Sequence, residues 1–329
     1  MLRIGIIGCG KIAEKHLNAY KKMEGIEITV SDVVEKGEII ARNYGVNWSD
    51  NPDRLIQGNK IDVVDVCIPT PSHGEVILKA LEYDKHVFCE KPFTRNFREA
   101  KEVEKKAAQT NKIVMIGYLY RFHPALEFSR EIIKERIIGE PYWAIFRLGG
   151  RGSHKAWKHK RKTGGGASNE MLVHMLDLVL WFFDEIKEVK NLYTDIILKE
   201  REIEGEKIEV DAEDVILLKL EIKGGATVLC ESDLITPSYM NYIEIQGTNG
   251  SLLTSILDYF PVIVYCKEPR GVYDRGNNFF KFPKVDLFEK ELSHFIESIK
   301  DNKEPEMNSV EDSVKIMKII DELRIEVVK

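Results

Sequence analysis

Hydrophobic and polar positions alternate in two ways along the first third of the chain. Short apolar runs rich in β-branched residues predict strands at 2–8, 26–32, 61–69, 86–90 and 112–119. The segments between them have the spacing of amphipathic helices, at about 11–22, 34–43, 72–83 and 96–109. Because apolar strands separated by helices are typical of a parallel sheet covered on both faces, we expect an α/β domain here.

The pattern changes near residue 124. A helix, a strand, a glycine-bearing loop and a second apolar helix lead into long strands such as VILLKLEI, with the hairpin turns KGG and GTNG between later strands. Two further helices close the chain, at about 286–300 and 309–324. We therefore predict two domains, residues 1–122 and residues 123–329, the second built on a large, mostly antiparallel sheet.

Composition narrows the class of protein. The 329 residues are 43% hydrophobic and carry a formal net charge of −6, which disfavours general nucleic-acid binding. The five cysteines are widely spaced, so they predict neither a disulfide framework nor a zinc site. The sequence opens without a basic-then-apolar leader and has no uncharged run of membrane-spanning length. We expect a cytoplasmic protein with no membrane or nucleic-acid partner.

A glycine motif follows the first predicted strand. Gly8 and Gly10 belong to GCGKIA, which fits the pattern G-x-G-x-x-A between a strand and a helix. The first glycine permits a tight turn, and the second leaves room for a pyrophosphate at the helix N-terminus. Asp32 ends the second strand, where an acid binds a ribose 2′-hydroxyl and repels a 2′-phosphate. The motif therefore favours NAD, although the nearby Lys36 leaves NADP open.

Lys91 stands just beyond the strand 86–90 and before Pro92. Ligands of open α/β sheets bind beyond the carboxyl ends of the strands, so this lysine is expected at the nicotinamide end of a cofactor. The alternative is a surface cation paired with Glu90.

The helix after the triple glycine, GGGASNEMLVHMLDLVLWFF, is apolar on nearly every side. Its exceptions Glu170, His174 and Asp177 share one stripe, which should face a cleft or a polar network. A satisfied core histidine would give the same pattern. Glutamate and histidine four residues apart could also bind a metal, but no third and fourth ligand is evident, so we predict no metal site.

Several motifs together resemble the Gfo/Idh/MocA family, which includes glucose–fructose oxidoreductase and inositol dehydrogenases. They are GIIGCGKIAEKH, PTPSHGEVILKALEYDKHVFCEKP, GYLYRFHP, GGGASNEMLVHMLDLVLWF and FEKELSHFIESIKDNKEPE, in the family's order over nearly the whole chain. The resemblance implies a Rossmann dinucleotide-binding domain and an NAD(P)-dependent oxidoreductase acting on a sugar, a cyclitol or a related hydroxyl-bearing ring.

The resemblance also implies catalytic roles. His174 matches the family's catalytic histidine, Lys91 would contact both cofactor and substrate, and Glu170 falls on an acidic position before the histidine. His174 would take the hydroxyl proton while Lys91 stabilises the charge that develops on the same oxygen. Two departures, Glu170 where better-known members have aspartate and Leu172 in place of a glycine, put the substrate in doubt more than the chemistry.

Further residues are assigned on the same basis. The predicted cofactor-binding residues are Gly8, Gly10, Lys11, Ile12, Asp32, Pro69, Thr70, His73, Glu90 and Lys91. The predicted substrate-binding residues are Lys91, Tyr118, Arg121, Trp157, Asn169, Glu170 and His174. Packing between the domains would equally explain the tyrosine and the arginine, and His73 could simply cap its helix.

Two features bear on partners. The basic run 151–162, RGSHKAWKHKRK, is either solvated surface or a binding loop for an anionic group, with Trp157 stacking on a ring. The long strands are apolar on both alternate sets of positions, so one face of the sheet is expected to meet another subunit in a homodimer or homotetramer.

The leading hypothesis is an NAD-dependent sugar or cyclitol dehydrogenase. A redox-assisted hydrolase or epimerase that keeps its NAD is a related alternative. A non-catalytic dinucleotide-sensing regulator is a third, which the presence of Lys91 and His174 disfavours because a sensor needs neither group.

Overall fold

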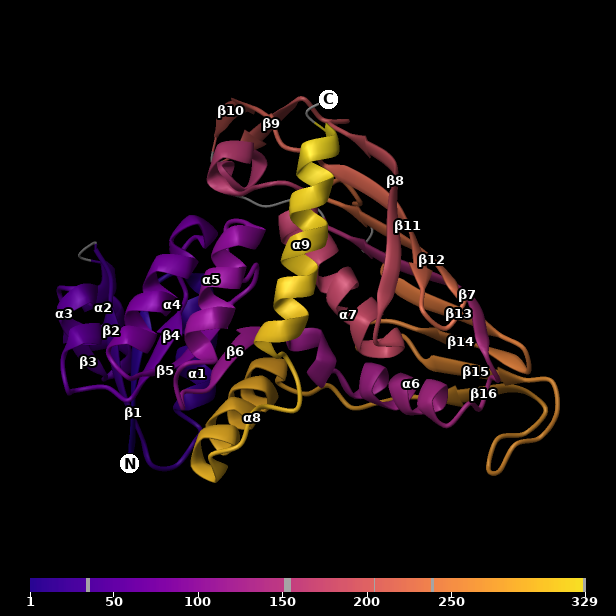
Figure 1. The fold of residues 1–329 in the computed structure, drawn as a ribbon, viewed down its shortest axis with the longest axis horizontal. Helices are drawn as coiled ribbons and strands as arrows, with labels where there is room; N and C mark the ends of the chain where they lie inside the picture. Colours follow the sequence, from indigo (N-terminus) through magenta and orange to yellow (C-terminus); the bar gives the residue numbers. More distant parts are fainter. Residues whose placement is uncertain (34–35, 151–154, 204, 238–239, 328–329) are drawn as a thin grey trace. The chain divides into compact units, whose positions relative to one another are not determined.

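The computed structural model describes residues 1–33, 36–150, 155–203, 205–237 and 240–327, with the side chains of Lys36 and 324–327 left out (Figure 1). The chain divides into two compact units. The first comprises Met1–Leu119 and Asp286–Asp321, and the second Tyr120–Val285 with the end of the last helix from Glu322.

The first unit contains a six-stranded, wholly parallel sheet. Its strands are β1 (Leu2–Ile7), β2 (Ile26–Ser31), β3 (Asn47–Ser49), β4 (Val63–Val66), β5 (His86–Glu90) and β6 (Val114–Gly117). The spatial order β3-β2-β1-β4-β5-β6 is that of the Rossmann fold, whose ligands bind at the carboxyl ends of the strands. This confirms the predicted dinucleotide-binding architecture.

Helices connect these strands. They are α1 (Lys11–Tyr20), α2 (Lys36–Tyr44), α3 (Pro52–Gln57), α4 (His73–Glu82) and α5 (Phe97–Ala107), with a 3-10 turn η1 (Thr70–Ser72) before α4. Asparagine side chains accept backbone N–H groups at the starts of two of them, Asn51 at α3 and Asn96 at α5. Such caps satisfy donors that a helix start otherwise leaves without a partner.

The first unit also holds the chain's end, which differs from the predicted division at residue 122. Helices α8 (Leu287–Asp301) and most of α9 (Val310–Val327) belong to it. Lys22, just after α1, lies 2.8 Å from Asp286 and 2.6 Å from Glu289, and the ring of Phe295 lies 5.5 Å from that of Phe88 on β5. Sequence order hides this packing because about half of the chain intervenes.

The second unit is built on an eight-stranded sheet. Its strands are β7 (Pro141–Gly149), β8 (Ile186–Asp195), β11 (Val215–Ile222), β12 (Thr227–Asp233), β13 (Tyr242–Gly247), β14 (Gly250–Thr254), β15 (Val262–Cys266) and β16 (Gly276–Phe280). Their order is β16-β15-β14-β13-β7-β12-β11-β8, antiparallel except for β7 with β12. A separate hairpin pairs β9 (Glu200–Ile203) with β10 (Glu206–Glu209).

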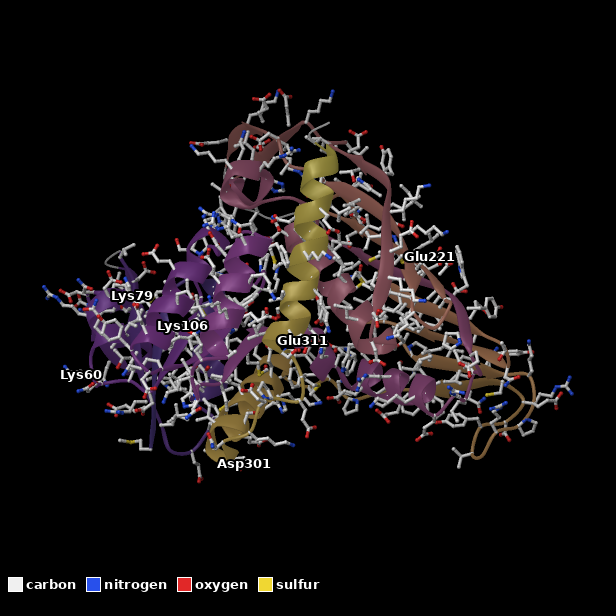
Figure 2. All side chains as sticks on the ribbon, viewed as in Figure 1. Lys60, Lys79, Lys106, Glu221, Asp301 and Glu311 are labelled. Carbon is white, nitrogen blue, oxygen red and sulfur yellow. The ribbon has the colours of Figure 1, made fainter. Side chains whose placement is uncertain are left out.

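One face of this sheet is covered and the other is more open. Helices α6 (Pro124–Lys134) and α7 (Val173–Phe183) lie along the covered face (Figure 1). Along β11, alternate residues from Ile216 to Ile222 are buried, whereas Lys219 and Glu221 stay partly exposed on the opposite face (Figure 2 labels Glu221). The helices therefore bury one apolar set of strand positions and leave the other set uncovered.

Among the residues with described positions, no helix is long and apolar enough to cross a membrane.

Candidate active site

The glycine loop of the first unit has the geometry that its sequence predicts. Gly8 has φ +97°, and a Cβ there would lie 2.6 Å from the carbonyl oxygen of Cys67, so no other residue fits without rearrangement. Gly10 precedes α1, and a Cβ built on it meets nothing within 4 Å. The start of α1, with Lys11 and Ile12 partly exposed, is thus open to a ligand. Its N–H groups and helix dipole suit a pyrophosphate.

Asp32 lies beside this loop. Its carboxylate oxygen Oδ2 accepts the backbone N–H of Cys9 at 2.7 Å, which fixes the acid between the ends of β1 and β2. A carboxylate held there fits a ribose hydroxyl. The side chain of Lys36, which left NADP open, is outside the described part of the chain.

The segment after β4 carries three predicted cofactor residues. Pro69 and Thr70 begin the turn η1. His73 is the first residue of α4, but its buried ring does not cap the helix: Nε2 lies 2.8 Å from the carbonyl oxygen of Ile68, and Nδ1 lies 2.8 Å from that of Pro92. Burial lowers the pKa of His73. A neutral ring, with one N–H, donates to one of these carbonyls at a time. The histidine therefore ties the start of α4 to one of these two segments at a time.

Lys91 follows β5 directly and is partly exposed, as predicted. The alternative for Lys91 is a surface ion pair with Glu90. Glu90 is buried, its Oε2 accepts the backbone N–H of Lys91 at 3.2 Å, and its Oε1 lies 3.1 Å from Nε2 of His16 on α1. The glutamate therefore holds the main chain at the lysine.

In the second unit, the triple glycine lets the chain fold back on itself. Gly164 and Gly166 have φ values of +80° and +110°, and a Cβ on Gly165 would overlap the backbone of Lys158. Gly166 donates its N–H to the carbonyl oxygen of Lys158 at 3.0 Å. The buried amide of Asn169 donates to the carbonyl of Gly164 at 2.9 Å, so its donor group fastens the glycine turn.

This turn places the basic loop against the start of the apolar helix. A π-helical turn η5 (Ser168–Leu172) leads into α7. Lys158 forms an ion pair with Glu170 in η5, and its ammonium lies 5.3 Å from the centre of the Trp157 ring. Lys160 lies 3.9 Å from Asp211, another carboxylate. Two of the loop's cations thus face acids, which weakens the anion-binding hypothesis; residues 151–154 lie outside the described residues.

The polar stripe of the helix is confirmed in part, because its members have separate partners. His174 is 6% exposed, and its ring centre lies 4.8 Å from that of Tyr120. Asp177 is buried and accepts hydrogen bonds from the guanidinium of Arg121. The distance from Nη2 to Oδ1 is 2.7 Å, and that from Nε to Oδ1 is 3.0 Å. Arg121 therefore forms an ion pair with α7. The sequence suggested that it contacts the substrate or packs between the domains. The stripe fixes the segment around Tyr120 and Arg121 to the helix.

The predicted residues thus fall into two groups. The first unit gathers the glycine loop, Asp32, Lys91 and also Tyr118, which is buried just after β6. The second gathers residues around His174 at the start of α7. Sequence reasoning missed Tyr120, the ring against His174, and it gave His16 no role. The sequence feature that could have indicated a role for His16 is its position as a polar residue on the buried face of α1.

His16 also belongs to a group that could hold a metal ion. Ligand atoms of His16, Asp65 and Cys67 lie within 4.8 Å of one another. Hydrogen-bond distances account for the grouping, because Nδ1 of His16 lies 2.8 Å from Asp65 and 3.3 Å from the Cys67 sulfur. Burial raises the pKa of the Cys67 thiol, so a metal ion bound here would have to displace its proton.

Comparisons with known proteins agree with this geometry. Residues 2–118 match the family model described as "Oxidoreductase family, NAD-binding Rossmann fold", and residues 128–253 match the GFO/IDH/MocA C-terminal domain. Myo-inositol 2-dehydrogenase of Thermotoga maritima is 26% identical, over 96% of this chain and 93% of that protein. A 2,7-anhydro-N-acetylneuraminate hydratase of Escherichia coli is 26% identical, over 77% of this chain and 67% of that protein.

A solved structure has the same fold. Levoglucosan dehydrogenase in complex with NADH and L-sorbose superposes with a TM-score of 0.89 at 21% identity, covering 99% of this chain and 96% of the other. The two family models, one for each half, together span most of the sequence. The chain therefore belongs to the Gfo/Idh/MocA family of NAD-binding oxidoreductases.

Proposed function

We propose that this protein is an NAD-dependent dehydrogenase that moves a hydride between a secondary alcohol of a sugar or cyclitol and the nicotinamide. The observation that carries the proposal is the presence of Lys91 and His174 at the family's motif positions. Lys91 lies beyond a strand of the Rossmann sheet, and His174 lies near the start of α7. Relatives named as an inositol dehydrogenase and a levoglucosan dehydrogenase support the substrate class.

The residues of the first unit fit NAD. Gly10 leaves the start of α1 open to the pyrophosphate, and Asp32 is held where a ribose hydroxyl would bind. Bound NAD⁺ supplies the hydride acceptor. The chain supplies binding and orientation, with Pro69 and Thr70 at the carboxyl end of β4 on the expected path of the dinucleotide.

Lys91 and His174 act on one substrate oxygen in this proposal. The histidine takes the hydroxyl proton as the hydride leaves, and the lysine ammonium stabilises the negative charge developing on the oxygen. Each residue is supported within its own unit. Glu90 holds the main chain at Lys91, while the Tyr120 ring lies against His174. The reaction is reversible, so ketone reduction is equally allowed.

The preferred substrate in this proposal is uncharged. Glu170 forms an ion pair with Lys158, so these two charges near the start of α7 neutralise each other. Such a pair offers both a donor and an acceptor to neighbouring sugar hydroxyls. Trp157 beside it provides an apolar surface for the CH face of a ring.

A redox-assisted reaction is the second candidate. The relative named as 2,7-anhydro-N-acetylneuraminate hydratase motivates it. The same Lys91 and His174 would then support transient oxidation of the substrate, and the hydride would return before product release.

A substrate panel with NAD⁺ distinguishes the two. Inositols, aldoses, anhydrosugars, sugar acids and nucleotide-sugars are each incubated with the enzyme, while NADH absorbance and products are both followed. A dehydrogenase produces NADH in equal amount to ketone. Product formation without net NADH supports the second candidate, and a lack of both with every compound contradicts the proposed substrate class.

The open face of the eight-stranded sheet supports a homo-oligomer. Leu229 on β12 and Ile145 on β7 are in register on that face, and Leu253 on β14 lies in the same row beyond Glu244. All are partly exposed. We propose that a second copy of the chain covers this row, which light scattering on Ile145→Glu and wild-type protein would test. Loss of the oligomer supports the proposal, and an unchanged mass contradicts it.

A further inference from the structure

A buried charged cluster lies in the core of the first unit, and two of its three members, His16 and Asp65, have no part in the reaction described above. It joins His16 of α1, Asp65 of β4 and Glu90 of β5. The side chains of the first two are fully buried, and that of Glu90 is 11% exposed. Buried charges are costly unless they are paired, so this cluster should have a purpose beyond packing.

The histidine ring lies between two carboxylates. Nδ1 is 2.8 Å from Oδ2 of Asp65, and Nε2 is 3.1 Å from Oε1 of Glu90. Ionised carboxylates only accept hydrogen bonds, so both ring nitrogens can donate only when the ring is an imidazolium. Burial lowers the pKa of His16, but electrostatic interactions and hydrogen bonds with Asp65 and Cys67 together outweigh it, and the pKa is raised well above its ordinary value.

The surroundings keep this ring in one place. Phe88 of β5 packs edge-on at 5.4 Å between ring centres, and Phe288 of α8 packs at 5.6 Å. The Tyr20 ring is 6.5 Å away on the next turn of α1. Other titratable groups near the cluster, among the described residues, include Cys67, 3.3 Å from Nδ1, and the buried Glu291 of α8, which contributes to the field at Tyr20. Cys89 and His73 are also buried and interact electrostatically with Glu90.

The cluster is connected to the proposed catalytic lysine through one carboxylate. The Oε1 atom of Glu90 contacts His16, and its Oε2 atom accepts the backbone N–H of Lys91 at 3.2 Å. We propose that His16 is a positioning residue, which fixes the Glu90 carboxylate and through it the main chain from which Lys91 reaches the substrate. This inference rests on the proposed function of Lys91.

The position of His16 on α1 extends the role. The same helix begins at the glycine loop, where the pyrophosphate of NAD is expected. His16 thus joins the helix that receives the cofactor to the strand that carries Lys91. A displacement of about 1 Å in a reacting group can cost about 10²-fold in rate, so a distant histidine can control turnover without touching substrate.

Substitution of the histidine tests the proposal. His16→Phe retains a ring but removes both donors, and His16→Gln retains one amide donor for one carboxylate. We expect kcat to fall about 10–100-fold in His16→Phe and less in His16→Gln, with the dissociation constant of NADH changed by less than about threefold. Leu17→Val, a buried change on the same helix that removes no polar contact, is the control for lost stability.

Several outcomes would overturn it. His16 does not position Lys91 if His16→Phe and Leu17→Val are equally stable and have the same kcat. The same conclusion holds if the only effect of His16→Phe is weaker binding of NADH. Stoichiometric transition metal in the purified protein would show that His16, Asp65 and Cys67 form a metal site instead. Lys91→Met separates the two proposals: if it retains turnover, the proposed function fails, whatever His16 does.

A spectroscopic measurement on the wild-type protein covers the case in which His16→Phe does not fold. Histidine-selective ¹⁵N labelling reports the ring nitrogens of all eight histidines, and His16→Gln assigns the signal of His16. Two protonated nitrogens at pH 7–8 support a bridging imidazolium. A neutral tautomer at that pH contradicts the bridge between the two carboxylates.

Discussion

Removal of Arg121 should destabilise the second unit and slow catalysis together. The side chains of Arg121 and Asp177 are 3% and 1% exposed, and their shortest contact is 2.7 Å. Arg121→Met leaves a carboxylate buried without its guanidinium partner. Breaking a buried pair in this way typically costs about 3–5 kcal/mol.

The magnitude can be converted into a melting temperature. For a domain of about 150–250 residues, each kcal/mol shifts Tm by about 2–4 °C, so Arg121→Met should lower Tm by roughly 6–20 °C. Asp177→Leu together with Arg121→Met should recover most of this loss, because no buried charge then remains. Arg130→Met is the control, since Arg130 donates to the carbonyl oxygen of Trp181 on the same helix at 2.7 Å.

Scanning calorimetry and activity should be measured on the same preparations. Below the new Tm, Arg121→Met should lose kcat, because Tyr120 beside Arg121 lies against His174. NADH binding should persist, since the glycine loop belongs to the other unit. A loss of less than about 1 kcal/mol, or a double variant as unstable as the sum of both singles, would refute the argument.

Three further predictions follow from individual contacts. Asp32→Ser should reduce the preference for NAD over NADP, measured as a ratio of kcat/KM values, and an unchanged ratio would argue against the ribose assignment. Lys158→Met should raise KM for the substrate but not for NAD, because Glu170 loses the ammonium of Lys158; a substrate KM equal to that of the wild type would show that the pair is only structural. The raised pKa of His16 implies stability that is full below its ordinary pKa of about 6.5 and declines as pH rises toward the folded value. Urea titrations should show this decline in the wild type and a flatter profile in His16→Gln/Asp65→Asn, and identical slopes would contradict it.

Much of the fold follows from local pattern. The five predicted strands of the first unit all form, because each is a run of apolar β-branched residues between helices. The unpredicted β3 has three residues, too few to show a period, and α3 is a six-residue helix with a proline at its start. Strand β8 was missed because none of its residues is fully buried and its sequence, IKEVKNLYTD, is largely polar.

The site was predictable where one backbone geometry demands one residue type. Gly8, with positive φ and no room for a Cβ, is such a position. The place of Lys91 directly after β5 followed from the strand pattern instead. Partners across the fold were not predictable. Neither the pairing of Arg121 with Asp177 nor that of His16 with Glu90 leaves a local signal, since each joins elements far apart in sequence.

The central claim is that Lys91 and His174 act on one substrate oxygen. Single-turnover hydride transfer, measured by NADH absorbance in wild type, His174→Ala, Lys91→Met and the double variant, tests it most directly. We expect His174→Ala to lose about 10²–10⁴ in rate, as general-base removal does, and Lys91→Met to lose at least as much.

The double variant decides between shared and separate action. NADH fluorescence should first show that each variant still binds the dinucleotide. If the account is correct, the double variant is little slower than the poorer single, because groups that act as a unit are non-additive. Near-normal hydride transfer in His174→Ala, or losses that multiply in the double variant, would contradict it.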